Sequence, residues 1–156
     1  ALLHALAHDK RKCVFMVSDS QVAAQSVVTA AAHALTTKQG PPGLRGSRIV
    51  DLTDPSRFDD DLASALDQMD KLFIEAAEAP EVILFLPAVE PPGTPKSAHR
   101  WLDLLRSMLT ARATRCMCRV APIAYKSLIE RDAVFKQSSS AMWISEQARG
   151  DVPTEL

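Results

Sequence analysis

Cys116 and Cys118 are the residues of this sequence whose type and spacing most suggest metal or redox chemistry. They stand two positions apart in an apolar run, so on a strand both side chains lie on one face. A structural zinc site usually takes Cys and His ligands in two such pairs, and no second pair has that spacing here. With Cys13 the cysteines number three, which does not make a disulfide framework. We interpret them as small core residues of a protein kept in a reducing intracellular compartment, the cytoplasm or an organelle stroma or matrix.

The other reactive residue types form no recognisable active site either. The serine run 138–140 has no His and Asp at an arguable spacing and is assigned to a turn. The acidic run 59–61 stands where a helix begins, where negative charge interacts favourably with the helix dipole. His4, His8 and His33 are expected on helices without a ligand role. The sequence therefore predicts no catalytic residue and no metal site.

Composition limits the class of partner. The chain has 156 residues, 47% of them hydrophobic and 24% charged, and its 18 basic and 19 acidic side chains give a net charge of -1. A nucleic-acid or anionic-membrane partner would call for a basic excess, and no apolar run approaches the ~20 residues that span a bilayer. We expect residues 1–156 to form one domain, and the absence of a starting Met suggests a fragment of a longer protein.

Apolar patterning predicts a short helix followed by alternating strands and helices. The strand segments are 13–17, 48–52, 81–86, 115–120 and 141–145. The helical segments are 2–9, 21–36, 57–78, 97–112 and one around 125–129. Such alternation predicts an α/β fold, a three-layer αβα sandwich around a five-stranded parallel sheet. Segment 81–86 is the most hydrophobic strand and is expected at the centre of the sheet.

Ligands of such a sheet bind beyond the carboxyl ends of its strands, so the residues there decide the chemistry. A phosphate-binding turn would be rich in glycine and would carry a Lys and a Ser or Thr where the helix opens. The first turn, residues 17–24, reads VSDSQVAA and has none of these. The third strand is expected to end in Pro87 and Ala88, where carboxylates would hold a magnesium ion. Phosphate chemistry is therefore missing at both places.

Several segments resemble the Clp-family AAA+ ATPase module of the ClpA, ClpB and ClpC type. Residues 125–133, YKSLIERDA, are similar to the family's Tyr-Arg-Lys-Tyr-Ile-Glu-Lys-Asp-Ala, and EVILFL at 81–86 resembles its Walker B strand. GLRGSRIV at 43–50, FDDDL at 58–62 and the segment 101–119 resemble further family segments, in the same order along the chain. The resemblance implies the large α/β subdomain of that module, with strand order 5-1-4-3-2 and without the small helical lid.

The resemblance also locates the positions where the family holds nucleotide. The Walker A lysine and threonine correspond to Ala23 and Ala24, and the Walker A glycines to Val17, Ser20 and Val22. A valine at a glycine position places a branched side chain where phosphate must approach. The resemblance therefore implies a degenerate Walker A turn.

The remaining functional positions of the family are lost in the same way. The Walker B aspartate and catalytic glutamate correspond to Pro87 and Ala88, and sensor 1 to Val120 or Ala121. The paired arginines that complete a neighbour's site correspond to Gln137 and Ser138 in an expected loop 136–140. The segment that should carry the pore-loop aromatic is shortened to residues 53–56 and has no tyrosine.

What the resemblance implies is a pseudo-ATPase without a cofactor, which acts through protein contacts as an interaction, regulatory or structural module. The alternative is a non-canonical ATP- or ADP-binding domain of a Clp-type chaperone or unfoldase. Its partner would be Clp-like subunits or the rest of its own chain, and the isolated fragment is expected to be a monomer or weak dimer. The expected partner surface is in and beside the loop 87–95, at Glu90, Pro91, Pro92, Thr94 and His99. A flavodoxin-like domain is a further alternative, which its strand order 2-1-3-4-5 would distinguish.

Overall fold

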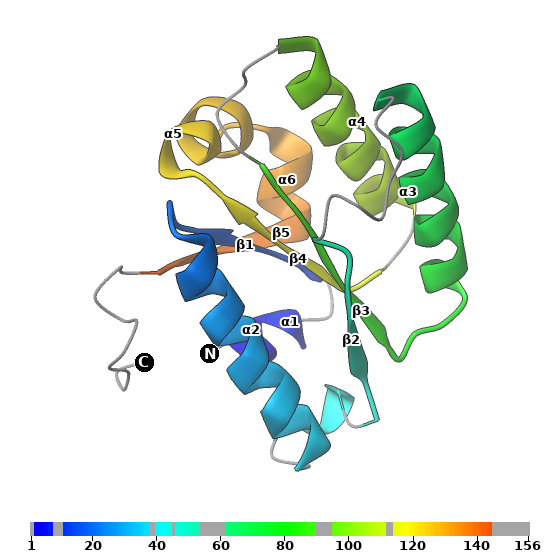
Figure 1. Ribbon diagram of the computed structural model, residues 1–156, viewed down its shortest axis with the longest axis vertical. Helices are drawn as coiled ribbons and strands as arrows, with labels where there is room; N and C mark the ends of the chain where they lie inside the picture. The colour runs from blue at the N-terminus through cyan, green and yellow to red at the C-terminus, as the bar shows by residue number, and fades with distance from the viewer. Residues whose placement is uncertain are drawn as a thin grey trace.

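The sheet is fully parallel and has five strands (Figure 1). The computed structural model describes residues 2–7, 11–37, 40–44, 46–53, 62–89, 95–111 and 114–144. Its strands are β1 (Cys13–Val17), β2 (Arg48–Asp51), β3 (Val82–Val89), β4 (Cys116–Val120) and β5 (Ser139–Trp143). Their order in the sheet is β2-β3-β4-β1-β5, which confirms the order 5-1-4-3-2 and is not the flavodoxin-like order.

The centre of the sheet is β4, not the strand 81–86 that the sequence placed there. That segment became β3, which is internal but second from the edge. Hydrophobicity reports burial of both faces of a strand, and β1, the first five residues of β3, and β4 are all buried on both faces. Position within the sheet depends on which strands pair, so hydrophobicity could not rank these three.

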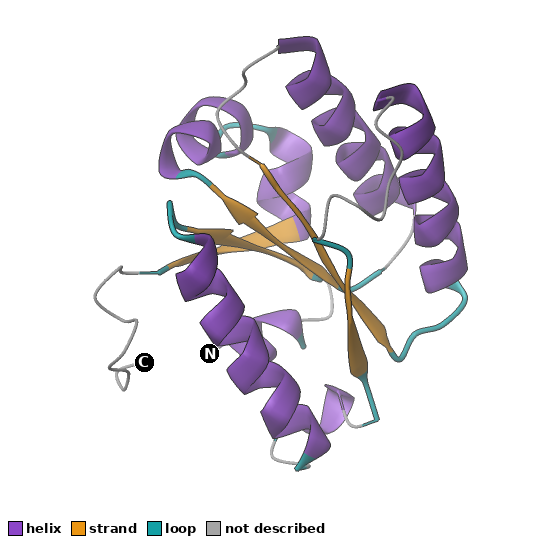
Figure 2. Cartoon of the chain, viewed as in Figure 1, coloured by secondary structure: helices purple, strands orange, loops and turns teal. Residues whose placement is uncertain are grey.

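Helices cover both faces of the sheet, as Figure 2 shows. On one face lie α1 (Leu2–Leu6), α2 (Gln21–Thr36) and the 3₁₀ turn η1 (Pro42–Leu44), packed on alternate strand residues such as Val14 and Ile83. The opposite face carries the remaining helices, whose core includes Phe15 and Leu84. They are α3 (Leu62–Ala77), α4 (Pro95–Ala111), α5 (Pro122–Ala124), the π-helical turn η3 (Tyr125–Ile129) and α6 (Ala133–Ser138). The predicted three-layer αβα sandwich is confirmed. Among the described residues no helix is long and apolar enough to cross a membrane.

Most element boundaries agree with the sequence prediction to within a few residues. The helix predicted at 21–36 has those bounds, the one at 97–112 spans Pro95–Ala111, and that at 57–78 is α3, with 57–61 outside the described residues. The helix predicted over 2–9 ends at Leu6, and residues 8 and 9 lie outside the description. Phe15 and Phe85, two residues of the inner strands, are fully or almost fully buried.

The predicted loop 136–140 and the turn assigned to 138–140 are wrong. Helix α6 runs to Ser138, and β5 begins at Ser139, before the predicted start of the fifth strand. A helix this short gives too little apolar periodicity to detect in the sequence. Its N-cap Asp132 was the available signal, since the carboxylate accepts hydrogen bonds from the amides of Val134 (2.9 Å) and Phe135 (3.3 Å).

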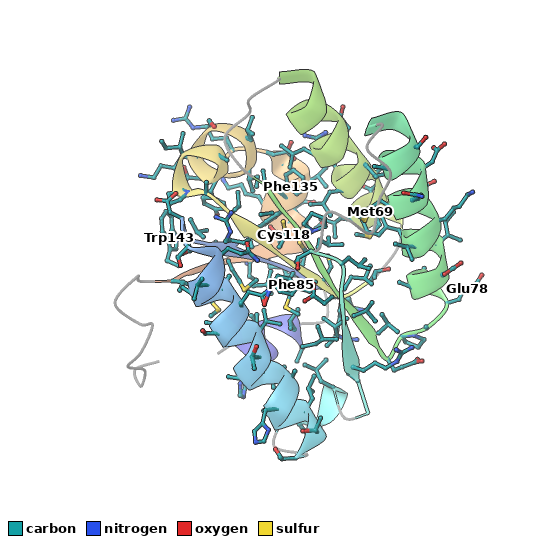
Figure 3. The ribbon with its side chains drawn as sticks, in the orientation of Figure 1. Met69, Glu78, Phe85, Cys118, Phe135 and Trp143 are labelled. Atoms are coloured by element: carbon teal, nitrogen blue, oxygen red, sulfur yellow. The ribbon has the colours of Figure 1, made fainter. Side chains whose placement is uncertain are left out.

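The three cysteines are core residues, as predicted. Cys13, Cys116 and Cys118 are free thiols with no exposed surface, and Cys13 faces Cys116 across β1 and β4. The hydrogen bond with the Cys116 thiol, together with burial, raises the pKa of Cys13 well above its ordinary value. Within the described residues no three His, Cys, Asp or Glu side chains gather as metal ligands. Figure 3 shows Cys118 in the middle of the molecule and Trp143 at its periphery.

An ion pair between Arg106 and Asp132 connects α4 to the N-cap of α6. Arg106 donates from Nε (3.1 Å) and Nη2 (2.7 Å) to Oδ2 of Asp132, and its guanidinium lies 5.4 Å from the centre of the Phe135 ring. Phe135 is fully buried and meets Phe15 edge-to-face, with ring centres 5.5 Å apart. The ion pair thus connects the helix cap to the core beneath β5.

We expect Asp132→Ala to lower the free energy of unfolding by about 0.5–2 kcal/mol at neutral pH through loss of the cap, with loss of the ion pair adding to this. Hydrogen bonding to Arg106 lowers the pKa of Asp132, so the stability it contributes is present above its ordinary pKa of 3.8 and is lost as pH falls through the lowered value. Urea unfolding over a pH series should therefore show wild type and variant converging in acid.

The matched control is Asp103→Ala. Asp103 pairs with the same arginine but its side chain is 70% exposed, so its removal should cost much less. Equal losses for the two variants, or a difference for Asp132→Ala that does not vary with pH, would contradict this account of α6.

Candidate functional site

The place where a ligand of this fold would bind is the turn between β1 and α2. Val17 ends β1 level with Val120 at the end of β4 and with Trp143 at the end of β5. Only Ser18, Asp19 and Ser20 separate Val17 from the first residue of α2. The amide of Ser18 donates to the carbonyl of Val120 (3.0 Å), so the turn begins tied to the neighbouring strand.

Backbone amides at the start of α2 already donate hydrogen bonds to oxygen atoms of the chain itself. The hydroxyl of Ser20 accepts from the amide of Ala23 (3.0 Å), and the Ser20 carbonyl accepts from Ala24 (3.2 Å). The hydroxyl of the buried Ser18 accepts in turn from the amide of Ser20 (3.0 Å). Amides at a helix N-terminus are the groups that bind phosphate in phosphate-binding turns. Here Ser20 acts as an ordinary N-cap instead.

Arg119 is the buried charged residue of this site, and the sequence analysis missed it. It lies on β4 with only 3% of its surface exposed. Its Nη1 donates to the carbonyl of Ser18 (2.7 Å) and its Nε to Oε1 of Gln21 (2.8 Å). The guanidinium therefore holds the turn and the first residue of α2 against β4. An arginine inside an otherwise apolar strand, CMCRV, was the available signal, because arginine is rarely buried without partners.

Most of the positions that correspond to a Walker A motif are buried or engaged in the helix cap. Val17, Ala23 and Ala24 are 1%, 2% and 0% exposed and belong to the core. Ser20 is engaged in the cap, and Val22 is 68% exposed on the outer side of α2. Of the apolar residues among these positions, Val22 is the accessible one. The others pack α2 closely on the sheet because their side chains are small.

The positions that correspond to Walker B lie inside a strand and not at its end, contrary to the prediction. Strand β3 continues through Pro87 and Ala88 to Val89, and its register against β4 shifts between Leu86 and Val89. A proline has no amide to donate to the ladder, which fits an irregularity at this point. The carbonyl of Pro87 accepts from the Cys118 thiol (3.1 Å). Both positions therefore serve the sheet.

The other predicted positions are dispersed. Val120 and Ala121 are buried, and the Ala121 amide donates to the carbonyl of Val89 (3.0 Å). Gln137 is exposed near the end of α6. The partner surface proposed from sequence falls outside the described residues at Glu90, Pro91, Pro92 and Thr94, and His99 lies in α4 with its side chain outside the description. Residues 53–56 are described only at Thr53, which bonds Asp51.

Strand order and layering define the class of fold, which is that of the AAA+ type of P-loop NTPase. A solved structure of similar fold is entitled "S. cerevisiae Hsp104:casein complex, Extended Conformation". It matches 92% of this chain with a TM-score of 0.62 at 15% identity. The chain spans 25% of the length of the Hsp104 chain. No protein-family model and no curated protein matches the sequence. At this identity the likeness shows the fold alone.

Replacing Arg119 should loosen this site measurably. We expect Arg119→Met to lower the free energy of unfolding by about 1–3 kcal/mol, because the carbonyl of Ser18 loses a partner in a buried place. The amides of Ser20 and Ala23 should also exchange faster with solvent. Urea unfolding and amide hydrogen exchange measure the two effects.

Arg131→Met is the matched control, since Arg131 is exposed and surface changes usually stay within about 0.5 kcal/mol. An Arg119 variant as stable as this control, with unchanged exchange at Ser20 and Ala23, would show that the guanidinium does not hold the turn.

Proposed function

We propose that this chain is a degenerate Clp-like AAA+ large subdomain that neither hydrolyses nor binds nucleotide and that acts through protein contacts. The observation that carries the proposal is the set of hydrogen bonds in the β1–α2 turn. The hydroxyl of Ser20 accepts from the amide of Ala23, and the guanidinium of Arg119 donates to the carbonyl of Ser18. Binding a phosphate at the amide of Ala23 would require breaking its hydrogen bond with Ser20. The absence of lysine and glycine from the turn supports the same conclusion.

The magnitude of the loss favours complete inactivity over weak activity. Phosphoryl transfer depends on groups that stabilise charge on the moving phosphate, and an arginine finger alone contributes ~10³–10⁵ in rate. In this chain the corresponding positions are Ala23, Pro87, Ala88, Gln137 and Ser138. Losing the lysine, the carboxylates and the arginines together leaves no group in these positions to stabilise that charge.

Three free, buried cysteines favour a reducing intracellular compartment for this domain. A net charge of -1 favours a protein partner over nucleic acid or an anionic membrane. We propose that the partner is another Clp-like subunit or another part of the same polypeptide. Such a contact has no nucleotide between the subunits to stabilise it, so it must rest on the surface of the domain itself.

Purified protein should show no ATP hydrolysis and no nucleotide binding tighter than millimolar. A ligand at about 100 times its dissociation constant adds about 2.7 kcal/mol of stability, which raises the melting temperature by several degrees. We therefore expect no shift in melting temperature with magnesium ATP or ADP, and no heat of binding by calorimetry. Micromolar affinity for either nucleotide would favour the alternative, a nucleotide-binding domain without the usual motifs.

We expect the isolated domain to be a monomer or a weak dimer at micromolar concentration. The positions that correspond to the family's paired arginines are Gln137 and Ser138, so a neighbour's cleft would lack the charges that hold subunits together across nucleotide. Light scattering with and without magnesium ATP measures the mass. A stable hexamer, or a mass that increases with nucleotide, would contradict the proposal.

A further inference from the structure

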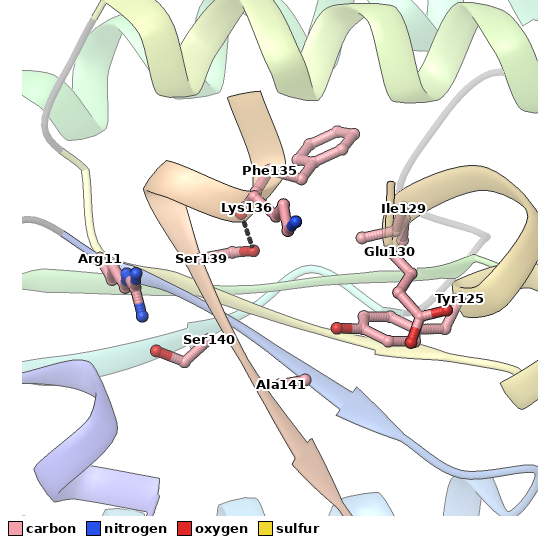
Figure 4. A pocket seen from close by; sticks show the side chains of 9 residues that line it. All are labelled: Arg11, Tyr125, Ile129, Glu130, Phe135, Lys136, Ser139, Ser140 and Ala141. Atoms are coloured by element: carbon pink, nitrogen blue, oxygen red, sulfur yellow. Dashed lines mark hydrogen bonds between the residues drawn. The ribbon is translucent and has the colours of Figure 1, made fainter. Parts of the chain in front are cut away.

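A hollow of about 350 Å³ lies beside β5, away from the β1–α2 turn. Its floor includes Ala141, whose side chain is too small to fill the space between η3 and α6. Figure 4 shows Arg11 toward one end of the hollow, Tyr125 with Glu130 toward the other, and Lys136 and Ser139 between them. The volume is within the range of small binding pockets.

The walls of this hollow are fixed by packing. Tyr125 meets Trp143 edge-to-face with ring centres 5.9 Å apart, and Phe135 is held against Phe15. The π-helical turn brings Tyr125 and Glu130 to the same side, since the amide of Glu130 bonds the carbonyl of Tyr125 (2.8 Å). Partial burial and the nearby Glu130 carboxylate raise the pKa of Tyr125, so its hydroxyl stays protonated as a hydrogen-bond donor. The hollow is therefore preformed.

The charges around the hollow are unequal at its two ends. Arg11 lies toward one end of the hollow, Lys136 lies near its middle, and the carboxylate of Glu130 lies toward the other end. The nearby Asp132 is already paired with Arg106. Across the described residues, no carboxylate forms an ion pair with Lys136. An acidic group would thus be attracted to the part of the hollow between Arg11 and Lys136.

Strand β5 also offers backbone groups, because among the described residues it is an edge of the sheet and pairs with β1 on one side only. The amide of Ile144 donates to Val17 on β1, so in an alternating strand the N–H and C=O groups of Ala141 and Trp143 point outward. Its sequence, SSAMW, has none of the charges or prolines that commonly protect such an edge. Trp143 is 56% exposed.

We propose that β5 and the hollow over Ala141 bind an extended acidic segment of a partner protein by strand addition. The backbone of the segment pairs with Ala141 and Trp143, and an acidic side chain enters the hollow next to Lys136. The inference rests on the proposed function, in that a domain acting through protein contacts needs such a surface. It names the surface and the chemistry of the partner.

The test uses a short blocked peptide that alternates glutamate with valine, titrated into the labelled domain without nucleotide and followed by amide NMR. We expect saturable shifts at the amides of Ala141 and Trp143, and about tenfold weaker binding, or about 1.4 kcal/mol, when lysine replaces glutamate. Equal binding of the two peptides, or no saturable binding of the glutamate peptide, would overturn the proposal. So would a domain that dimerises through its β5 edges in preference to binding the peptide.

Two variants test the hollow itself. Lys136→Glu reverses a charge at an exposed position, and Ala141→Phe fills the floor, so each should weaken the glutamate peptide about tenfold or more. Lys126→Glu is the matched control, because Lys126 is exposed on η3 and does not line the hollow. Equal binding by Lys136→Glu and Lys126→Glu would overturn the proposal. Nucleotide binding is measured separately, so tight ATP binding would defeat the proposed function whatever the peptide does.

Discussion

The hydrogen bonds of Arg119 are the interaction on which the β1–α2 turn depends. Burying a cation without hydrogen-bond partners costs free energy, and Arg119 is only 3% exposed. Its guanidinium donates to the Ser18 carbonyl and to the side-chain amide oxygen of Gln21. These contacts join the central strand β4 to the turn and to the first residue of α2. Alanines at positions 23 and 24 then let the helix lie close to the sheet.

The same hydrogen bonds support the proposed function. In a phosphate-binding turn the backbone amides are left for the ligand, and charged side chains approach it from the adjacent strands. Here Ser20 caps the helix, and Arg119 donates to the Ser18 carbonyl of the turn. The carbonyl of Pro87 accepts a hydrogen bond from the Cys118 thiol. Each group serves the stability of the domain. Under the proposed function the domain acts through its surface, and within the described residues β5 is an edge with outward-facing backbone groups and no protecting charge.

The sequence predicted the architecture well, because long apolar periodic segments such as 21–36 and buried runs such as 13–17 determine their own structure. The strand order came from the resemblance and could not have come from hydrophobicity, which placed the wrong strand at the centre. The short helix α6 was missed because its local signal is one capping residue, Asp132. Arg119 was missed because its role depends on β4 lying beside β1, a contact between residues 101 positions apart. The hollow over Ala141 depends on how η3, α6 and β5 pack together, which apolar patterning does not show.

The most direct test of the central claim is the NMR signal of the Arg119 side chain. A guanidinium fixed on Ser18 and Gln21 should give a resolved Nε–H resonance that exchanges slowly with solvent, because the group is buried and hydrogen-bonded. The account predicts that this resonance is present and does not move when millimolar magnesium ATP is added. A resonance that exchanges rapidly would mean that the guanidinium does not hold the turn. A resonance that shifts saturably with nucleotide would mean that the turn opens to receive phosphate.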